Sequence, residues 1–157
     1  MTPTLGWVVA HPARFIAFGA GSGLLRPAPG TWGTLLAWVT FAPLTAGLDG
    51  PAILLVPVCA FLIGVWACQK AAHDMGVADP GGIVWDEVAA FWLVLALVPT
   101  GFWSELAAFV LFRLFDIVKP PPIRYFDTTL KNGFGVMFDD TLAAFYTVLV
   151  MALLQRM

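Results

Sequence analysis

The chain has 157 residues, of which 60% are hydrophobic and only 11% are charged, and its mean hydropathy is +0.86. A soluble domain of this size could not hide so much apolar surface, because a small fold leaves a large share of its area facing water. The composition therefore excludes a soluble cytosolic enzyme and predicts a membrane protein. The formal net charge of −2 offers no basic field, so no nucleic-acid partner is expected.

Five hydrophobic runs alternate with short turns and longer polar loops. They cover residues 31–48, 51–68, 83–98, 102–118 and 141–154. At about 1.5 Å per residue, runs of roughly 16–18 residues reach about 24–27 Å, just short of a hydrocarbon core of about 30 Å, so these spans must stand nearly upright. We therefore expect an all-α fold, a polytopic membrane helix bundle of about five transmembrane helices, formed by residues 1–157 as one domain.

The segment before these runs has a different character. Residues 7–18 are too few to span a bilayer and include His11, Pro12 and Arg14. An interfacial or re-entrant helix is the preferred interpretation, and a sixth span is the alternative. Residues 1–30 are thus expected to form this segment and a glycine-rich loop, and residues 31–157 the helix bundle.

Charged residues gather at one end of the predicted bundle. The connectors 69–82 and 119–140 are long and polar, and they share one side of the membrane with most of the basic residues, which by the positive-inside rule makes that side cytoplasmic. Of the ten acidic residues, only Asp49 and Glu105 belong to the opposite face. Ionisable groups at helix ends in an apolar chain indicate function.

Two pairs of adjacent carboxylates are candidates for a metal site. Asp86 and Glu87 enter an otherwise apolar run, and Asp139 and Asp140 stand at the predicted start of the last helix. Neighbouring carboxylates repel unless a cation lies between them, and oxygen ligands without thiols or imidazoles favour Mg²⁺ or Mn²⁺ over zinc. The alternative for Asp139 and Asp140 is that they cap the N-terminus of the helix.

Basic side chains and a glycine-rich loop are candidates for a phosphate site. Arg113 and Asp116 are three residues apart on one helix face, and three prolines follow Lys119 and aim it, together with Arg124, at one place. The alternative is an ion pair that neutralises itself in the membrane, with Lys119 reaching lipid headgroups. The loop 19–34 contains glycines whose backbone N–H groups can converge on an anion, although it lacks the lysine and spacing of a P-loop.

Three motifs in this order resemble the phosphatidylglycerophosphatase A family of bacterial inner-membrane lipid phosphatases. The first is the loop from Gly21-Ser22-Gly23 to residues 29–34, the second joins Asp74-Met75-Gly76-Val77 to residues 83–87, and the third runs from Phe112-Arg113 to Asp139-Asp140. The resemblance covers residues 19–144, with small departures: Ala144 stands where the family often has glycine, and the arm before Gly19 is short. Neither departure touches the polar residues.

The resemblance implies an enzyme that uses Mg²⁺ to hydrolyse phosphatidylglycerophosphate to phosphatidylglycerol and phosphate, in a bacterial inner membrane with the active site facing the cytoplasm. On this reading Asp86, Glu87, Asp139 and Asp140 hold the metal, and Asp86, Glu87 and Asp116 take part in catalysis. Arg113, Lys119, Arg124, Ser22, Gly23, Gly30 and Thr31 bind the phosphate or the headgroup. Attack by water and an aspartyl-phosphate intermediate are both open.

Two other classes of protein compete with this interpretation. A small ion-coupled transporter or channel subunit would also carry intramembrane carboxylates, but these acids cluster at one end instead of crossing the bilayer. A non-catalytic scaffold would leave Asp86 and Glu87 without a role. The small residues of the short spans would allow close packing as a homodimer.

Overall fold

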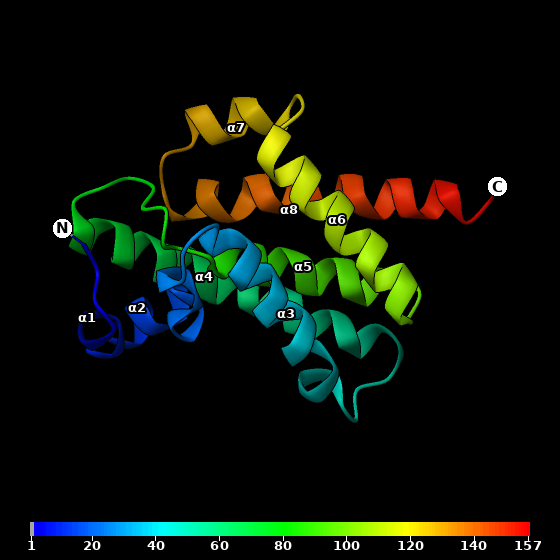
Figure 1. Ribbon diagram of the computed structural model, residues 1–157, viewed down its shortest axis with the longest axis horizontal. Coiled ribbons are helices and arrows are strands. Elements are labelled where there is room, and N and C mark those ends of the chain that lie inside the picture. Colours follow the sequence, from blue (N-terminus) through cyan, green and yellow to red (C-terminus); the bar gives the residue numbers. More distant parts are fainter. Residues whose placement is uncertain (1) are drawn as a thin grey trace.

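The computed structural model describes residues 2–157, and every regular element within that range is a helix. In chain order these are α1 (Leu5–Val9), α2 (Pro12–Ala17), the 3₁₀ helix η1 (Gly19–Leu24), α3 (Pro29–Thr45), the 3₁₀ helix η2 (Gly50–Leu54), α4 (Leu55–Met75), α5 (Trp85–Leu97), α6 (Phe102–Val118), α7 (Ile123–Thr129) and α8 (Gly133–Leu154). Helix α8 extends along the long axis of the molecule, and α7 lies beside its first half (Figure 1). The all-α prediction is confirmed.

Helix α5 is the centre of the bundle. Helices α3, α4, α6 and α8 all pack against it, and Val88, Phe91 and Val94 are fully buried. A helix that is apolar on all sides is stable only when neighbours cover every side, which explains its position. Hydrogen bonds fix two of these contacts: the indole N–H of Trp92 donates to the Ala37 carbonyl of α3, and that of Trp85 donates to the Ala60 carbonyl of α4, each at 2.9 Å.

Two helical stretches of residues 2–157 are long and apolar enough to cross a membrane: Gly50–Met75 and Gly133–Leu154. Helices α3 and α6 have 17 residues each, and α5 has 13. The prediction of about five spans is therefore not confirmed by length and composition. The difference arises because hydrophobic runs continue into the connectors: run 31–48 includes the turn after Thr45, and run 83–98 includes residues that precede Trp85.

The last helix begins earlier than its hydrophobic run. Helix α8 starts at Gly133, and Asn132 is its N-cap, with a side chain that accepts a hydrogen bond from the Gly135 N–H at 2.8 Å. The side chain of Gln69 accepts a further bond from the Gly133 N–H at 2.7 Å. The prediction that Asp139 and Asp140 stand at the helix start is wrong, and with it the capping alternative, because both residues lie in the second turn.

Replacing Asn132 with alanine should lower the free energy of unfolding by about 1 kcal/mol, because the Gly135 N–H would lose its acceptor. Thermal unfolding in detergent, followed by circular dichroism, measures the effect. Asn132→Asp keeps an acceptor at the same position and should stay close to the wild type. Equal stability of Asn132→Ala and the wild type would contradict this assignment of the cap.

The N-terminal segment folds as two short helices, of which α2 packs against α4 and α1 packs against α2 and η1. His11 separates them and caps α2, accepting a hydrogen bond from the Ala13 N–H at 3.1 Å. The Arg14 guanidinium donates to Asp74 of α4 at 2.9 Å, and it lies 4.3 Å from the ring centroid of Trp7. Neither α1 nor α2 is long enough to cross a bilayer, which disfavours the sixth span.

Candidate active site

A polar cavity of about 260 Å³ lies where α3 and α5 begin, α6 ends and α8 passes through its second turn. Its walls carry seven carboxylates and three basic side chains. These are Asp79, Asp86, Glu87, Asp116, Asp127, Asp139 and Asp140, together with Arg113, Lys119 and Lys131. The two carboxylate pairs of the sequence therefore meet in one place, although more than fifty residues separate them along the chain.

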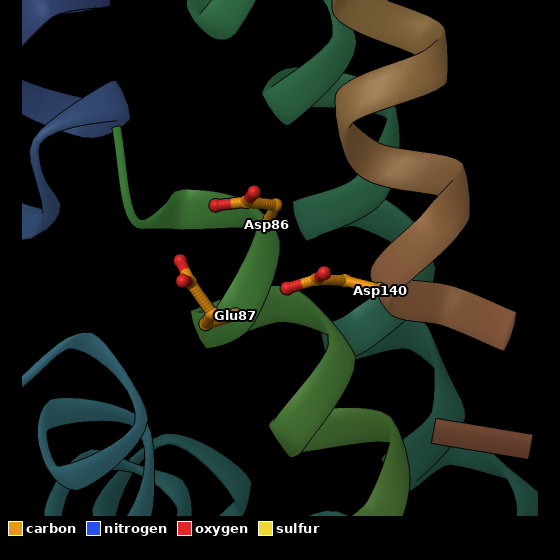
Figure 2. Close-up of side chains that lie close together, drawn as sticks. All are labelled: Asp86, Glu87 and Asp140. Carbon is orange, nitrogen blue, oxygen red and sulfur yellow. The ribbon is translucent and has the colours of Figure 1, made fainter. Parts of the chain in front are cut away.

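Three of the carboxylates converge closely enough to share one ion. Asp86 and Glu87, from the first turn of α5, and Asp140, from α8, each have an oxygen within 4.8 Å of the others, and their side chains point toward a common space (Figure 2). Asp140 is only 2% exposed. Asp86 Oδ1, Glu87 Oε2 and Asp140 Oδ2 are buried and have no hydrogen-bond partner.

These orphaned oxygens fit a hard divalent cation. A buried carboxylate without a donor is costly, and like charges this close repel, unless a positive charge compensates them. Carboxylate oxygens without thiol or imidazole ligands are the donor set that suits Mg²⁺ or Mn²⁺. Asp139, predicted as a fourth ligand, lies outside this group of three. Its Oδ2 accepts a hydrogen bond from Lys119 at 2.5 Å, and its buried Oδ1 has no hydrogen-bond partner.

Arg113 faces the carboxylate group from α6. Its Nη1 lies 2.6 Å from Asp116 Oδ2, one turn further along the helix, and 3.6 Å from Glu87 Oε1. The side chain is only 14% exposed, and its buried Nε–H has no partner. A guanidinium has five N–H donors, and Arg113 uses only one of them in a hydrogen bond, to Asp116. The remaining donors are suited to binding a phosphate oxygen.

Lys119 occupies the left-handed position that ends α6, with φ of 49°. Its Nζ donates to Asp139 and, at 3.0 Å, to Asp127 of α7. Burial opposes the charged form of Lys119, but its hydrogen bonds to Asp139 and Asp127 outweigh this effect and raise the pKa of Lys119. The ammonium therefore stays charged at neutral pH. Burial acts against ionisation of Asp127 too, yet its hydrogen bond with Lys119 holds the pKa of Asp127 below its usual value.

The chain leaves Lys119 in a fixed direction. Pro120 to Pro122 cannot continue the helix, and the Tyr146 hydroxyl of α8 donates a hydrogen bond to the Pro121 carbonyl at 2.7 Å. Tyr146 also packs edge-on against Phe115 of α6, with 5.6 Å between ring centroids. The proline exit is thus tied to the same helix that supplies Asp139 and Asp140. Lys119 lines the cavity, but Arg124, which the prolines were expected to aim at the same place, does not.

Gly30, in the first turn of α3, lines the cavity next to Glu87 and Arg113. A Cβ at this position would collide with Glu87 Oε1 and would lie 2.9 Å from Arg113 Nη2. Any side chain here would separate the carboxylate from the guanidinium. This glycine therefore serves close approach of two functional groups rather than backbone flexibility.

Four predicted substrate-binding residues do not line the cavity. Ser22 lies in η1, and its buried Oγ has no hydrogen-bond partner. A Cβ on Gly23 would collide with the Gly82 carbonyl, so Gly23 allows two backbone segments to pack closely. Thr31 is half-buried in α3, and Arg124 is exposed on α7. Their part in substrate binding stays a prediction.

The cavity also contains acids and a lysine that sequence reasoning did not select. Asp127 belongs to the third motif and lies in α7, eight residues after Lys119, and this membership was the available signal. Asp79 and Lys131 come from the loops before α5 and α8. Loop charges are usually solvated, so nothing in their sequence context marked these two.

At the other end of the bundle, Glu105 has a structural role. Its carboxylate accepts a hydrogen bond from the Trp38 indole at 2.7 Å and another from the Gly101 N–H at 3.1 Å, where α6 begins. Both oxygens are thus engaged in fixing a helix end. Glu105 therefore offers no free carboxylate for an ion on its way to Asp86 and Asp140, which counts against an ion pathway.

Comparison with known proteins identifies the family of the chain. The family model described as phosphatidylglycerophosphatase A matches residues 15–155. The phosphatidylglycerophosphatase A of Haemophilus influenzae is 50% identical over 92% of this chain and 90% of its own length, and that of Escherichia coli is 43% identical over 86% and 78%. A putative phosphatidylinositol-3-phosphatase of Bacteroides thetaiotaomicron is 41% identical over 87% and 89%.

No solved structure gives a significant match. The family match nevertheless spans all the elements that build the cavity, from α3 to α8. Both named homologues cover most of the chain, and nothing among these relatives supports the transporter alternative. The chain belongs to the phosphatidylglycerophosphatase A family, and it is a phosphatase.

Proposed function

We propose that this protein hydrolyses the terminal phosphate ester of phosphatidylglycerophosphate, giving phosphatidylglycerol and inorganic phosphate, with the help of Mg²⁺. The observation that supports this proposal best is the group of three converging carboxylates with orphaned oxygens, opposite Arg113 in one cavity. Two homologues named for this reaction, at 50% and 43% identity, agree with it.

Asp86, Glu87 and Asp140 would hold the ion. When bound, Mg²⁺ supplies a Lewis acid for a phosphoryl oxygen and favours deprotonation of an attacking water. Asp139, predicted to be a ligand, instead holds Lys119 at the edge of the ion site. That position suits a residue that orients a phosphate-binding group.

The protein's own side chains would bind and orient the phosphate. Arg113 donates from its free Nε–H, and Lys119 offers a charge that stays positive. Charges aimed at the phosphoryl oxygens stabilise the transition state more than the ground state, because negative charge spreads over these oxygens as the ester bond breaks. Asp116 fixes the guanidinium and lies in the cavity wall, where a base for the attacking water is needed.

We place the cavity at the cytoplasmic surface of the bacterial inner membrane, with α3, α5 and α6 completing a multi-pass bundle around the two long apolar helices. The support is the gathering of basic loops at this end. Helices shorter than the bilayer core are tolerated when the membrane thins locally or flanking residues reach the interface. A cavity at this level meets a phospholipid headgroup without removing the lipid from the bilayer.

Removal of divalent metal tests this function. In detergent micelles, the purified protein should release phosphate from phosphatidylglycerophosphate with Mg²⁺ present, and EDTA should reduce the rate to background until excess Mg²⁺ restores it. Full activity in EDTA would contradict the metal assignment. Phosphatidylinositol 3-phosphate, chosen because of the Bacteroides relative, serves as the comparison substrate, and faster release from it would reassign the headgroup.

A further inference from the structure

A second hollow in the molecule differs from the active-site cavity in chemistry. It is an apolar groove of about 430 Å³ between α2 with η1 on one side and α3 with α5 on the other. Leu36, Thr40, Pro43 and Leu44 of α3 form one wall, and Trp85 and Trp92 of α5 form another. No ionisable residue lines it.

The few polar atoms of the groove are already satisfied inside the protein. The indole N–H groups of Trp85 and Trp92 donate to backbone carbonyls of α4 and α3, and the Thr40 hydroxyl donates to the Leu36 carbonyl at 2.6 Å. The side chains of the groove therefore present carbon surface with no spare donor. Such a surface fits a ligand that has no polar atoms, and it does not fit a headgroup.

The position of the groove relative to the active site follows from α3. Pro29, Leu36 and Pro43 are seven residues apart, so they lie on nearly the same side of the helix. Pro29 lines the active-site cavity, whereas Leu36 and Pro43 line the groove. At about 1.5 Å per residue, the groove begins about 10 Å further along α3 and continues for about another 10 Å away from the cavity.

We infer that this groove holds an acyl chain of the phospholipid substrate while its terminal phosphate lies in the cavity, an inference that rests on the proposed function. The separation along α3 leaves room for the polar part of the lipid between phosphate and acyl ester. The direction is the one an acyl chain takes in a bilayer, from the surface toward the centre. Residues near the groove's lipid-facing edge, Phe15 and Leu44, are 43% and 49% exposed, so a chain can enter from the membrane side.

Filling the far end of the groove tests the inference. Leu44→Trp should lower kcat/KM for the dioleoyl substrate about tenfold in mixed micelles, since loss of contact with roughly two methylenes has that effect. Hydrolysis of the dihexanoyl substrate should be unchanged, because its chains are too short to reach Leu44. Leu149→Trp is the matched control: Leu149 is 56% exposed on α8 and does not line the groove, and this variant should behave as the wild type on both substrates.

Other outcomes would overturn the assignment. If Leu44→Trp slowed both substrates equally, or neither, the groove would hold bulk lipid rather than the reacting molecule. A wild type that hydrolysed neither substrate would contradict the proposed function instead. The groove is then tested without turnover, using phosphatidylglycerophosphate with a photoreactive group at the end of one acyl chain. Labelling concentrated on residues 36–44 supports the inference. Equal labelling of residues 145–153 overturns it.

Discussion

Replacing Asp86 with asparagine should reduce the rate of phosphate release by at least about a thousandfold, because a metal ion contributes several kcal/mol of transition-state stabilisation and one of its three converging ligands would lose its charge. The folded protein should be no less stable than the wild type. The substitution removes one negative charge from a group in which buried oxygens have no hydrogen-bond partner. Phosphate release and thermal unfolding of the same preparation measure both effects.

A split between activity and stability separates a catalytic from a structural role. Asp140→Asn should behave in the same way, whereas Asp49→Asn, at an exposed position on the opposite side, should retain wild-type activity. Addition of Mg²⁺ should raise the unfolding temperature of the wild type but not that of Asp86→Asn, since a ligand that binds only the folded state stabilises it. Wild-type rates in both Asp86→Asn and Asp140→Asn would remove the metal site from this cavity.

Adding a single methyl group at Gly30 should reduce kcat/KM about a hundredfold, which is the order of loss when catalytic groups are displaced by about 1 Å. The new Cβ would collide with Glu87 Oε1 and press on Arg113 Nη2, so it would move a metal ligand and a phosphate-binding group at once. Steady-state kinetics of Gly30→Ala, with circular dichroism to establish folding, measures the effect.

The control for this substitution is Gly6→Ala in α1. A Cβ on Gly6 would meet nothing closer than Thr4 Oγ1 at 4.0 Å, so activity should not change, and stability should be equal to or slightly above that of the wild type because alanine favours the helix. If Gly30→Ala were as active as Gly6→Ala, the Glu87 and Arg113 side chains would have room to rearrange. The close approach seen in the structure would then be unimportant for catalysis.

The helical nature of the fold and most of the active site were predictable because they depend on chemistry that is local in sequence. Asp86 and Glu87 interrupt an apolar run, and a buried pair of acids needs compensation wherever the chain folds. Arg113 and Asp116 share a helix face by spacing alone, and their 2.6 Å contact agrees with that prediction. The polar residues gathered at one end because the bundle is antiparallel and its long loops lie together.

Other features depend on tertiary packing and could not be derived from pattern. The start of α8 is set by the Asn132 cap and by Gln69 of α4, so the helix includes polar residues that hydropathy excludes. The pairing of Asp139 with Lys119 requires the proline exit to turn back over α8, which residue spacing alone does not predict. The glycines near Gly23 resembled an anion cradle, yet Gly23 allows close contact with the Gly82 backbone.

The charges of the cavity also predict the order in which its ligands bind. Seven carboxylates face three basic side chains, and Arg113 and Lys119 are each paired with acids. A phosphate monoester that enters this cavity alone therefore meets net repulsion. A divalent cation held by Asp86, Glu87 and Asp140, as proposed, would lower that repulsion while Arg113 stays paired with Asp116 and Lys119 with Asp139. On the proposed function we therefore expect ordered addition, in which the cation binds before the lipid phosphate.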